Sequence, residues 1–251
     1  NKLIETINKP KTNRYSASKG ITGLLKAQAT YYDRRFNVKL KPESEIVATL
    51  GSKEGFANIA QAITAPGDII LAPNPTYPIH QFGFIISGGV IRNMPINPDE
   101  NFIRCLENEV LNSFPKPKVL VVNYPSNPTA LGATLDFYKE IVVFCKKHEL
   151  MILSDLAYSE IYFDNNPPPS ILQINGAKSI AVEFTSMSKT YAMPGWRIGF
   201  AVGNEKIISA LIRVKSYLDY GAFTPIQVAA TAALNGPQDC VEEIRLCYKS
   251  R

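Results

Sequence analysis

The stretch SMSKTYAMPGWR, residues 186–197, organises the rest of the chain. It lies between two apolar runs, 180–184 and 198–202, and both are typical of strands. Lys189 therefore follows the end of a buried strand, where ligands of α/β proteins bind. A desolvated lysine near another cation, here Arg197, is a good amine nucleophile, because both surroundings favour the neutral amine. These residues indicate Schiff-base chemistry rather than the ordinary alternative, a surface turn with two solvated cations.

The composition excludes several classes of protein. The 251 residues suffice for one large domain or two small ones, and 45% hydrophobic residues allow a sizeable core. The net charge of +5 comes from scattered basic residues without a Lys/Arg block, so we expect no nucleic-acid partner. No apolar run of about 18 residues is present, so we expect no membrane partner. Four Cys without a CxxC pair and only two His argue against a metal site and favour a reduced, cytoplasmic setting.

Hydrophobic periodicity predicts strands that alternate with helices, and hence an α/β fold with a mostly parallel sheet. The predicted strands, the second with its leading turn, are 45–50, 67–72, 90–94, 118–123, 150–154, 180–184 and 198–202. The predicted helices are 22–36, 56–64, 102–112, 135–147, 204–217, 226–234 and one that starts near residue 239.

Polar motifs follow three of these strands. Residues 51–55, GSKEG, separate a strand from a helix, a geometry in which backbone N–H groups and the positive helix end bind phosphate. The alternative is that Ser52 only caps the helix. The string NYPSNPT, residues 123–129, ends a run typical of a strand buried on both faces, and Asn127-Pro128 is a candidate cis-proline bond. Asp155 follows the next strand, either as a helix cap or as a functional carboxylate.

Taken in order, these motifs resemble those of class I (fold type I) aminotransferases, which depend on pyridoxal 5′-phosphate. The matching strings are S-x-S-K with a following G-x-R, N-x-P-x-N-P-T, and D-x-x-Y at residues 155–158. The resemblance covers nearly the whole chain. It implies a three-layer αβα fold with a mostly parallel mixed sheet, in which residues 1–236 form the large cofactor-binding domain. Residues 237–251 would begin the helix that leads to a small domain absent from this chain.

The resemblance also implies a contact with the cofactor for each motif. Lys189 would form the Schiff base and Tyr77 would stack on the ring. Asp155 would pair with the ring nitrogen, because a carboxylate there keeps the nitrogen protonated and makes the ring a strong electron sink. Asn127 and Tyr158 would bind the phenolic oxygen. The remaining implied contacts, mostly with the phosphate, are Ser52, Lys53, Ser186, Ser188, Arg197 and, in a homodimer, Tyr15 of the partner subunit.

The implied function is ping-pong transamination between an L-amino acid and a 2-oxo acid. The strings GSKEG, NPTYPIH, SDLAY and KSYLDYG are most similar to bacterial alanine (glutamate–pyruvate) aminotransferases, and then to LL-diaminopimelate and aspartate aminotransferases. A C–S β-lyase and a non-enzymatic regulator with an aminotransferase-like domain are the alternatives. His80 is given no catalytic role, since a packed histidine is the more common outcome.

We expect the sequence to be a fragment, because it lacks an initiator Met and ends inside a helical pattern. In the resembled family, an arginine near the C-terminus binds the substrate α-carboxylate, and that region lies beyond Arg251. Residues 1–251 alone are therefore expected to be inactive or weakly active.

Overall fold

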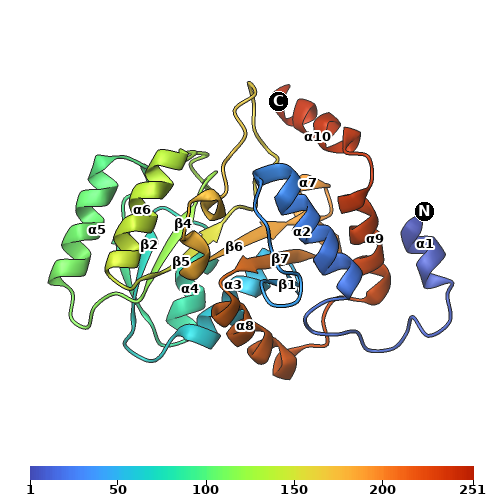
Figure 1. Cartoon of the computed structure of the whole chain (residues 1–251), viewed down its shortest axis with the longest axis horizontal. Coiled ribbons are helices and arrows are strands. Elements are labelled where there is room, and N and C mark those ends of the chain that lie inside the picture. The colour runs from blue at the N-terminus through green and yellow to red at the C-terminus, as the bar shows by residue number, and fades with distance from the viewer.

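The computed structural model describes residues 1–251 and has one seven-stranded sheet between two layers of helices (Figure 1). The strand order is β1-β7-β6-β5-β4-β2-β3, and every neighbouring pair is parallel except the two pairs that β7 forms. The strands are β1 Ile46–Thr49, β2 Ile69–Pro73, β3 Val90–Met94, β4 Val119–Asn123, β5 Met151–Asp155, β6 Ala181–Ser186 and β7 Gly199–Gly203. The predicted mostly parallel mixed sheet is confirmed.

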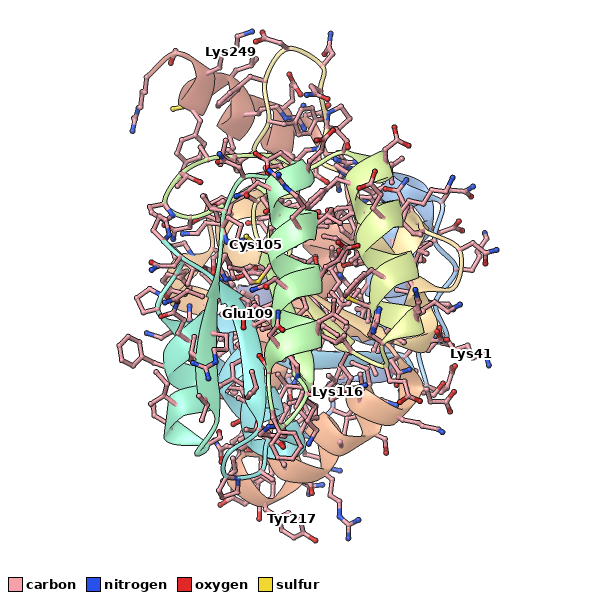
Figure 2. All side chains as sticks on the ribbon, turned by 90° about the vertical axis from the view of Figure 1, so that its left-hand side faces the viewer. Lys41, Cys105, Glu109, Lys116, Tyr217 and Lys249 are labelled. Carbon is pink, nitrogen blue, oxygen red and sulfur yellow. The ribbon has the colours of Figure 1, made fainter.

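Helices cover both faces of the sheet. Helices α4, α3 and α8 pack in a row on one face, while α2, α9, α5 and α6 lie on the other (Figure 1). Figure 2 shows the molecule from the side of α5, with Lys249 of α10 at one end and Tyr217 of α8 at the other. The α-helices are α1 Lys2–Ile7, α2 Thr22–Phe36, α3 Ser52–Ile63, α4 Ile79–Ile86, α5 Glu100–Asn112, α6 Leu135–Lys147, α7 Met187–Thr190, α8 Glu205–Leu218, α9 Thr224–Asn235 and α10 Asp239–Lys249. None of them combines the length and the apolar character needed to cross a membrane.

The side chains of the central strands pack into two separate hydrophobic cores, one on each face of the sheet. Along β4, Val119 and Val121 pack with α3, α4 and α8, whereas Leu120 and Val122 pack with the opposite layer. This happens because successive side chains of a strand point to opposite faces. The run of β4 is continuously apolar because helices cover both faces of the sheet.

Several helices differ from the prediction, among them α3 and α4. Helix α3 begins at Ser52 rather than Phe56, because the GSKEG segment forms its first turn instead of a loop before it. Helix α4, Ile79–Ile86, was not predicted. Its sequence IHQFGFII contains apolar residues on most of its circumference and a central glycine, so it lacks the polar face that marks an amphipathic helix.

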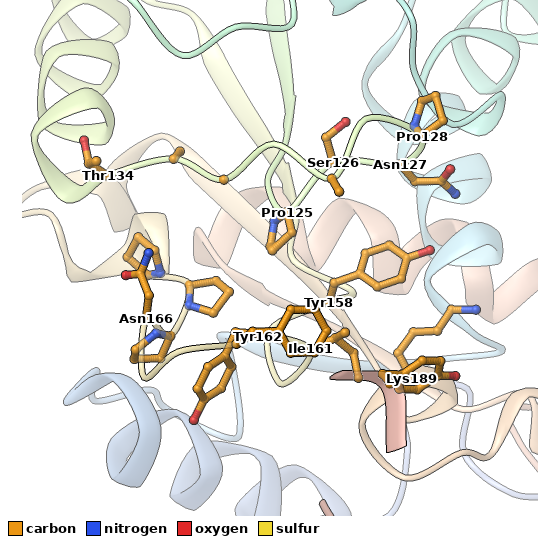
Figure 3. Close-up of a pocket in the computed structure, with 18 of the residues that line it drawn as sticks. Pro125, Ser126, Asn127, Pro128, Thr134, Tyr158, Ile161, Tyr162, Asn166 and Lys189 are labelled. Atoms are coloured by element: carbon orange, nitrogen blue, oxygen red, sulfur yellow. The ribbon is translucent and has the colours of Figure 1, made fainter. Parts of the chain in front are cut away.

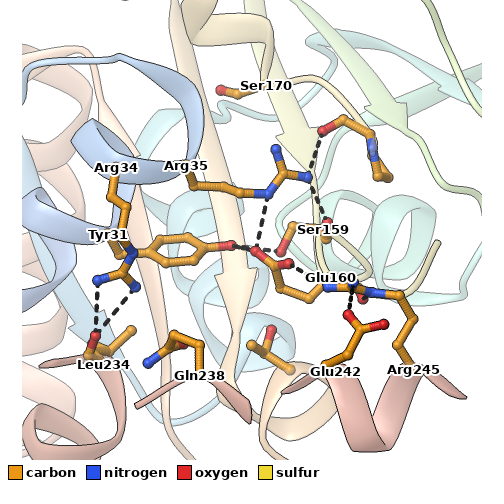
Figure 4. Close-up of polar contacts among 12 residues, drawn as sticks. Tyr31, Arg34, Arg35, Ser159, Glu160, Ser170, Leu234, Gln238, Glu242 and Arg245 are labelled. Carbon is orange, nitrogen blue, oxygen red and sulfur yellow. Dashed lines mark hydrogen bonds and ion pairs between the residues drawn. The ribbon is translucent and has the colours of Figure 1, made fainter. Parts of the chain in front are cut away.

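A buried ionic cluster attaches α10 to the body of the domain (Figure 4). Glu160 accepts hydrogen bonds from the Tyr31 hydroxyl at 2.8 Å and from Arg35 Nε at 3.1 Å. Its other oxygen lies 3.5 Å from Arg245 of α10, whose guanidinium stacks 3.9 Å from the Tyr162 ring centroid. Two arginines therefore neutralise one buried carboxylate and hold α2 and α10 against the segment that follows β5.

A second buried carboxylate lies within the sheet. Glu183 of β6 is fully buried and accepts from Tyr32 Oη at 3.0 Å, Ser154 Oγ at 3.1 Å and the Ile171 N–H at 3.1 Å, and also from Ser170 Oγ. Burial raises the pKa of Glu183 to about 7, although these four donors act in the opposite direction. Desolvation is the larger effect because the carboxylate has no contact with water.

Glu183 should make stability depend on pH. A raised folded-state pKa contributes stability that is present at acidic pH and is lost as the pH rises through about 7. We expect Glu183→Gln to reduce the fall in unfolding free energy between pH 5 and pH 8 by about 2–3 kcal/mol. Urea unfolding at both pH values measures this, with Glu107→Gln on the exposed side of α5 as the control. An unchanged pH dependence in Glu183→Gln would contradict the assignment.

Candidate active site

The carboxyl ends of the parallel strands meet at one edge of the sheet and surround a small cavity. Strands β4, β5 and β6 end there at Asn123, Asp155 and Ser186. The cavity has a volume of about 180 Å³. It is lined by Gly51, Ser52, Lys53, Tyr77, Asn123, Asn127, Asp155, Ala157, Tyr158, Ser186, Ser188, Lys189, Pro194 and Arg197. Every site residue predicted from the sequence lies in this lining except Tyr15.

Lys189 lies in the one-turn helix α7, directly after β6. Ser186 caps that helix, since its Oγ accepts the Ser188 N–H at 3.2 Å. The Lys189 Nζ atom lies 5.8 Å from the centroid of the Tyr158 ring. The strand end thus places the amine on the cavity wall, half-buried and next to a phenol.

The Asp155 carboxylate is buried and held from both sides. Its Oδ1 accepts the Ala157 N–H at 3.1 Å, and its Oδ2 lies 2.9 Å from His80 Nε2, which donates to it. The other ring nitrogen of His80 lies 2.7 Å from Thr76 Oγ1, and the histidine is fully buried. His80 is therefore a packed histidine, as predicted, but it also orients Asp155, which the sequence did not indicate.

The NYPSNPT segment is folded around its first residue. Asn123 Nδ2 donates to the Asp155 carbonyl at 3.0 Å, and Asn123 Oδ1 accepts the Asn127 N–H at 2.9 Å. The Asn127-Pro128 bond is cis, as predicted. Nearby, burial raises the pKa of Tyr158, and the Asp155 carboxylate adds to this shift. The Tyr158 phenol therefore stays protonated at neutral pH and can donate a hydrogen bond.

The start of α3 at Gly51 and the side chain of Arg197 together form an anion cradle. Gly51, not Ser52, is the N-cap, and no side chain caps the first turn, so its leading N–H groups are free for a ligand. Arg197 lies beside this turn and donates to the carbonyls of Pro194 at 2.8 Å and Leu50 at 3.1 Å. A Cβ atom on Gly51 would lie only 2.3 Å from Arg197 Nη2, and Gly51 has a φ of 86°, so any other residue would displace the guanidinium and strain the backbone.

Tyr77 and Lys53 complete the wall of the cavity. The Lys53 Nζ atom lies 6.0 Å from the Tyr77 ring centroid, and the Tyr77 ring meets the His80 ring edge-on at 6.0 Å. A flat half-buried ring thus lies on the side of the cavity that the β2–α4 connection forms.

A larger groove of about 1010 Å³ opens from the same site (Figure 3). Asn127, Tyr158 and Lys189 line both spaces and lie together at one side of Figure 3. The rest of the lining comes from residues 125–135 and 161–169 and from Tyr248, and it contains no charged side chain. The groove therefore gives a sizeable molecule access to the Lys189 amine.

Tyr15 lies outside the cavity of its own chain. Its ring stacks on that of Tyr220 at 4.3 Å, and Tyr15 is 82% exposed. It therefore contributes nothing to this site from within the same subunit.

The whole chain, residues 1–251, matches the family model described as aminotransferase class I and II. The chain belongs to this family. It is 67% identical over 250 residues to a protein of Rhizobium meliloti named aminotransferase AatC, covering 100% of this chain and 62% of the relative. It is 46% identical over 250 residues to the glutamate-pyruvate aminotransferase AlaC of Escherichia coli, covering 100% of this chain and 61% of the relative.

Solved structures agree with this membership. The substrate-bound structure of BacF from Bacillus subtilis superposes with a TM-score of 0.90 at 34% identity. The match covers 99% of this chain and 63% of BacF. The chain thus spans about three fifths of the length of these relatives.

Pyridoxal 5′-phosphate is the cofactor of this family, and the residues around the cavity fit it. The uncapped helix start and Arg197 suit a phosphate. A buried, oriented carboxylate suits a protonated ring nitrogen, and a primary amine suits an aldehyde.

The contact between His80 and Asp155 predicts a loss of stability when it is removed. His80→Leu leaves Asp155 Oδ2 and the Thr76 hydroxyl without their partner, which should lower the unfolding free energy by about 1–3 kcal/mol. The same substitution at His148, which makes no side-chain hydrogen bond and is partly exposed, is the control for urea unfolding. A loss no larger than that of His148→Leu would show that the contact is unimportant.

Proposed function

We propose that the protein catalyses transamination between an L-amino acid and a 2-oxo acid, with alanine and glutamate as the first candidate substrates. The observation that carries the proposal is the cavity at the sheet edge, where Lys189 Nζ, the Asp155 carboxylate and the Gly51–Arg197 cradle line one space. The relative named glutamate-pyruvate aminotransferase supports the choice of substrates.

Each part of the cavity has a role toward the cofactor in this proposal. Arg197, Ser186 and the start of α3 at Ser52 and Lys53 bind the phosphate, with Ser188 adjacent. Asp155, oriented by His80, pairs with the ring nitrogen. The Tyr77 ring stacks on the cofactor ring, while Asn127 and the protonated Tyr158 hydroxyl donate to the phenolic oxygen.

Pyridoxal phosphate, when bound, supplies an aldehyde that condenses with amines and a ring that accepts the negative charge of a deprotonated α-carbon. The chain supplies the proton transfer. Lys189 Nζ would take the α-proton of the amino acid and then give it to the former aldehyde carbon of the cofactor rather than back to the α-carbon. The Tyr158 ring beside the amine limits where the amine can move, and Asp155 keeps the ring nitrogen protonated.

We propose that the working enzyme is a cytoplasmic homodimer. Tyr15 is a large exposed aromatic residue outside its own cavity, and it stacks on Tyr220, which is also exposed. In the proposed dimer, Tyr15 of the partner subunit reaches the cofactor phosphate. Exposed aromatics of this kind are enriched at protein–protein interfaces.

The role of Lys189 can be tested by spectroscopy on the protein expressed from its complete gene. With added pyridoxal phosphate, the wild type should show an absorption band near the visible edge, and borohydride should bleach the band and leave the cofactor covalently on Lys189. Lys189→Ala should retain no cofactor after reduction, whereas Lys147→Ala, at an exposed position of α6, should behave as the wild type. Covalent cofactor on Lys189→Ala, or none on the wild type, would contradict the proposal.

The reaction type can be tested with substrate pairs. Alanine with 2-oxoglutarate should yield pyruvate and glutamate, with parallel double-reciprocal plots because the mechanism is ping-pong. LL-diaminopimelate with 2-oxoglutarate tests the second specificity. Release of pyruvate, ammonia and a thiol from cystathionine without an oxo acid would indicate a C–S β-lyase, and cofactor binding without turnover would indicate a regulator.

A further inference from the structure

A fully buried lysine outside the cavity contacts the first turn of α3, where the anion cradle lies. Lys215, near the end of α8, is 0% exposed. Its Nζ lies 2.8 Å from Glu54 Oε1 and 2.9 Å from Asp219 Oδ2. Neither the cavity nor the larger groove is lined by these three side chains. Two carboxylates from different segments therefore share one ammonium group that has no contact with solvent.

The Glu54 side of this cluster leads to the anion cradle. Glu54 lies in the first turn of α3, and its Oε2 accepts the Leu50 N–H at 2.8 Å. The Leu50 carbonyl in turn accepts from Arg197 Nη2 at 3.1 Å. One continuous set of contacts thus runs from Lys215 through Glu54 and the backbone N–H and carbonyl of Leu50 to the guanidinium that lines the cavity.

The Asp219 side leads to the exposed aromatic pair. Asp219 Oδ1 accepts the Gly221 N–H at 2.6 Å, and the Asp219 carbonyl accepts from Ser18 Oγ. A Cβ atom on Gly221 would lie 2.4 Å from the Ala17 carbonyl oxygen, so the two segments touch through their backbones. These contacts fix the segments that carry Tyr15 and Tyr220, which stack at 4.3 Å.

We propose that Lys215 is a positioning residue for two cofactor sites at once. Through Glu54 it holds the phosphate-binding turn and Arg197 of its own subunit. Through Asp219 it holds Tyr15 in the position from which Tyr15 would reach the partner's site. The proposal rests on the proposed function, because it requires pyridoxal phosphate in the cavity and a dimer.

The charges explain why a cation is needed at this position. Without the ammonium group, Glu54 and Asp219 would be two like charges close together in a poorly hydrated space, which is unfavourable. Their side chains are 22% and 15% exposed, so each can turn toward solvent. Glu54 would then release the Leu50 N–H, and Asp219 would release the Gly221 N–H.

The test compares pyridoxal phosphate with pyridoxal, which has the same ring and aldehyde but no phosphate. Lys215→Met keeps the length of the side chain and removes the charge. In this variant the Kd for pyridoxal phosphate should rise about tenfold or more, which corresponds to about 1.4 kcal/mol, while the Kd for pyridoxal stays within about twofold. Lys206→Met, an exposed position of the same helix, is the matched control and should change neither.

The two sides of the cluster can be separated by a double-mutant cycle. In a Tyr15→Phe background, Asp219→Asn should no longer raise the Kd for pyridoxal phosphate, because the Tyr15 hydroxyl that Asp219 positions is absent. Glu54→Gln should still raise this Kd in the same background. These variants also replace Lys215→Met if that protein does not fold. Equal weakening of pyridoxal and pyridoxal phosphate, or no weakening of either, would overturn the role of Lys215. A wild type that binds neither compound would overturn the proposed function instead.

Discussion

The direction of β7 is the constraint on which the site depends. Strands β1 and β6 run in the same direction, so their carboxyl ends lie at the same edge of the sheet. Strand β7 runs between them in the opposite direction and therefore begins at that edge. Arg197, which precedes β7, consequently meets the turn after β1 and the helix after β6. A parallel strand in this place would carry the arginine to the far end of the sheet.

This arrangement leaves little space between the three segments, and glycine provides it. A Cβ atom on Gly199 would lie 2.9 Å from both the Ser52 nitrogen and the Thr185 carbonyl oxygen. The first residue of β7 must therefore lack a side chain if the strand is to pair on both sides. The same crowding brings the uncapped start of α3 close to Ser186, so Ser52, Ser186 and Arg197 line one cavity.

Sequence patterns predicted the local motifs, but they did not predict side-chain contacts between residues that are far apart in the chain. Motifs that follow buried strands could be placed, because parallel strands bring their ends together whatever their order. The link from His80 to Asp155 spans 75 residues, and a lone histidine carries no sign of its partner. Two glycines flank the first turn of α3 and favour a loop there, so the sequence predicts a later helix start than the structure has. Lys215 falls within an apolar helical pattern, and nothing in that pattern distinguishes a buried lysine from a solvated one. The dimer, the substrates and the roles of individual site residues stay predictions.

The contact between Gly51 and Arg197 also limits how such a protein can diverge. Any side chain at position 51 would push the guanidinium away from the Leu50 and Pro194 carbonyls, and the positive φ of 86° would add backbone strain. Substitutions at the two positions are therefore coupled. In a related chain, a larger residue at position 51 would therefore indicate a displaced arginine, even if the lysine, the aspartate and the rest of the fold were retained.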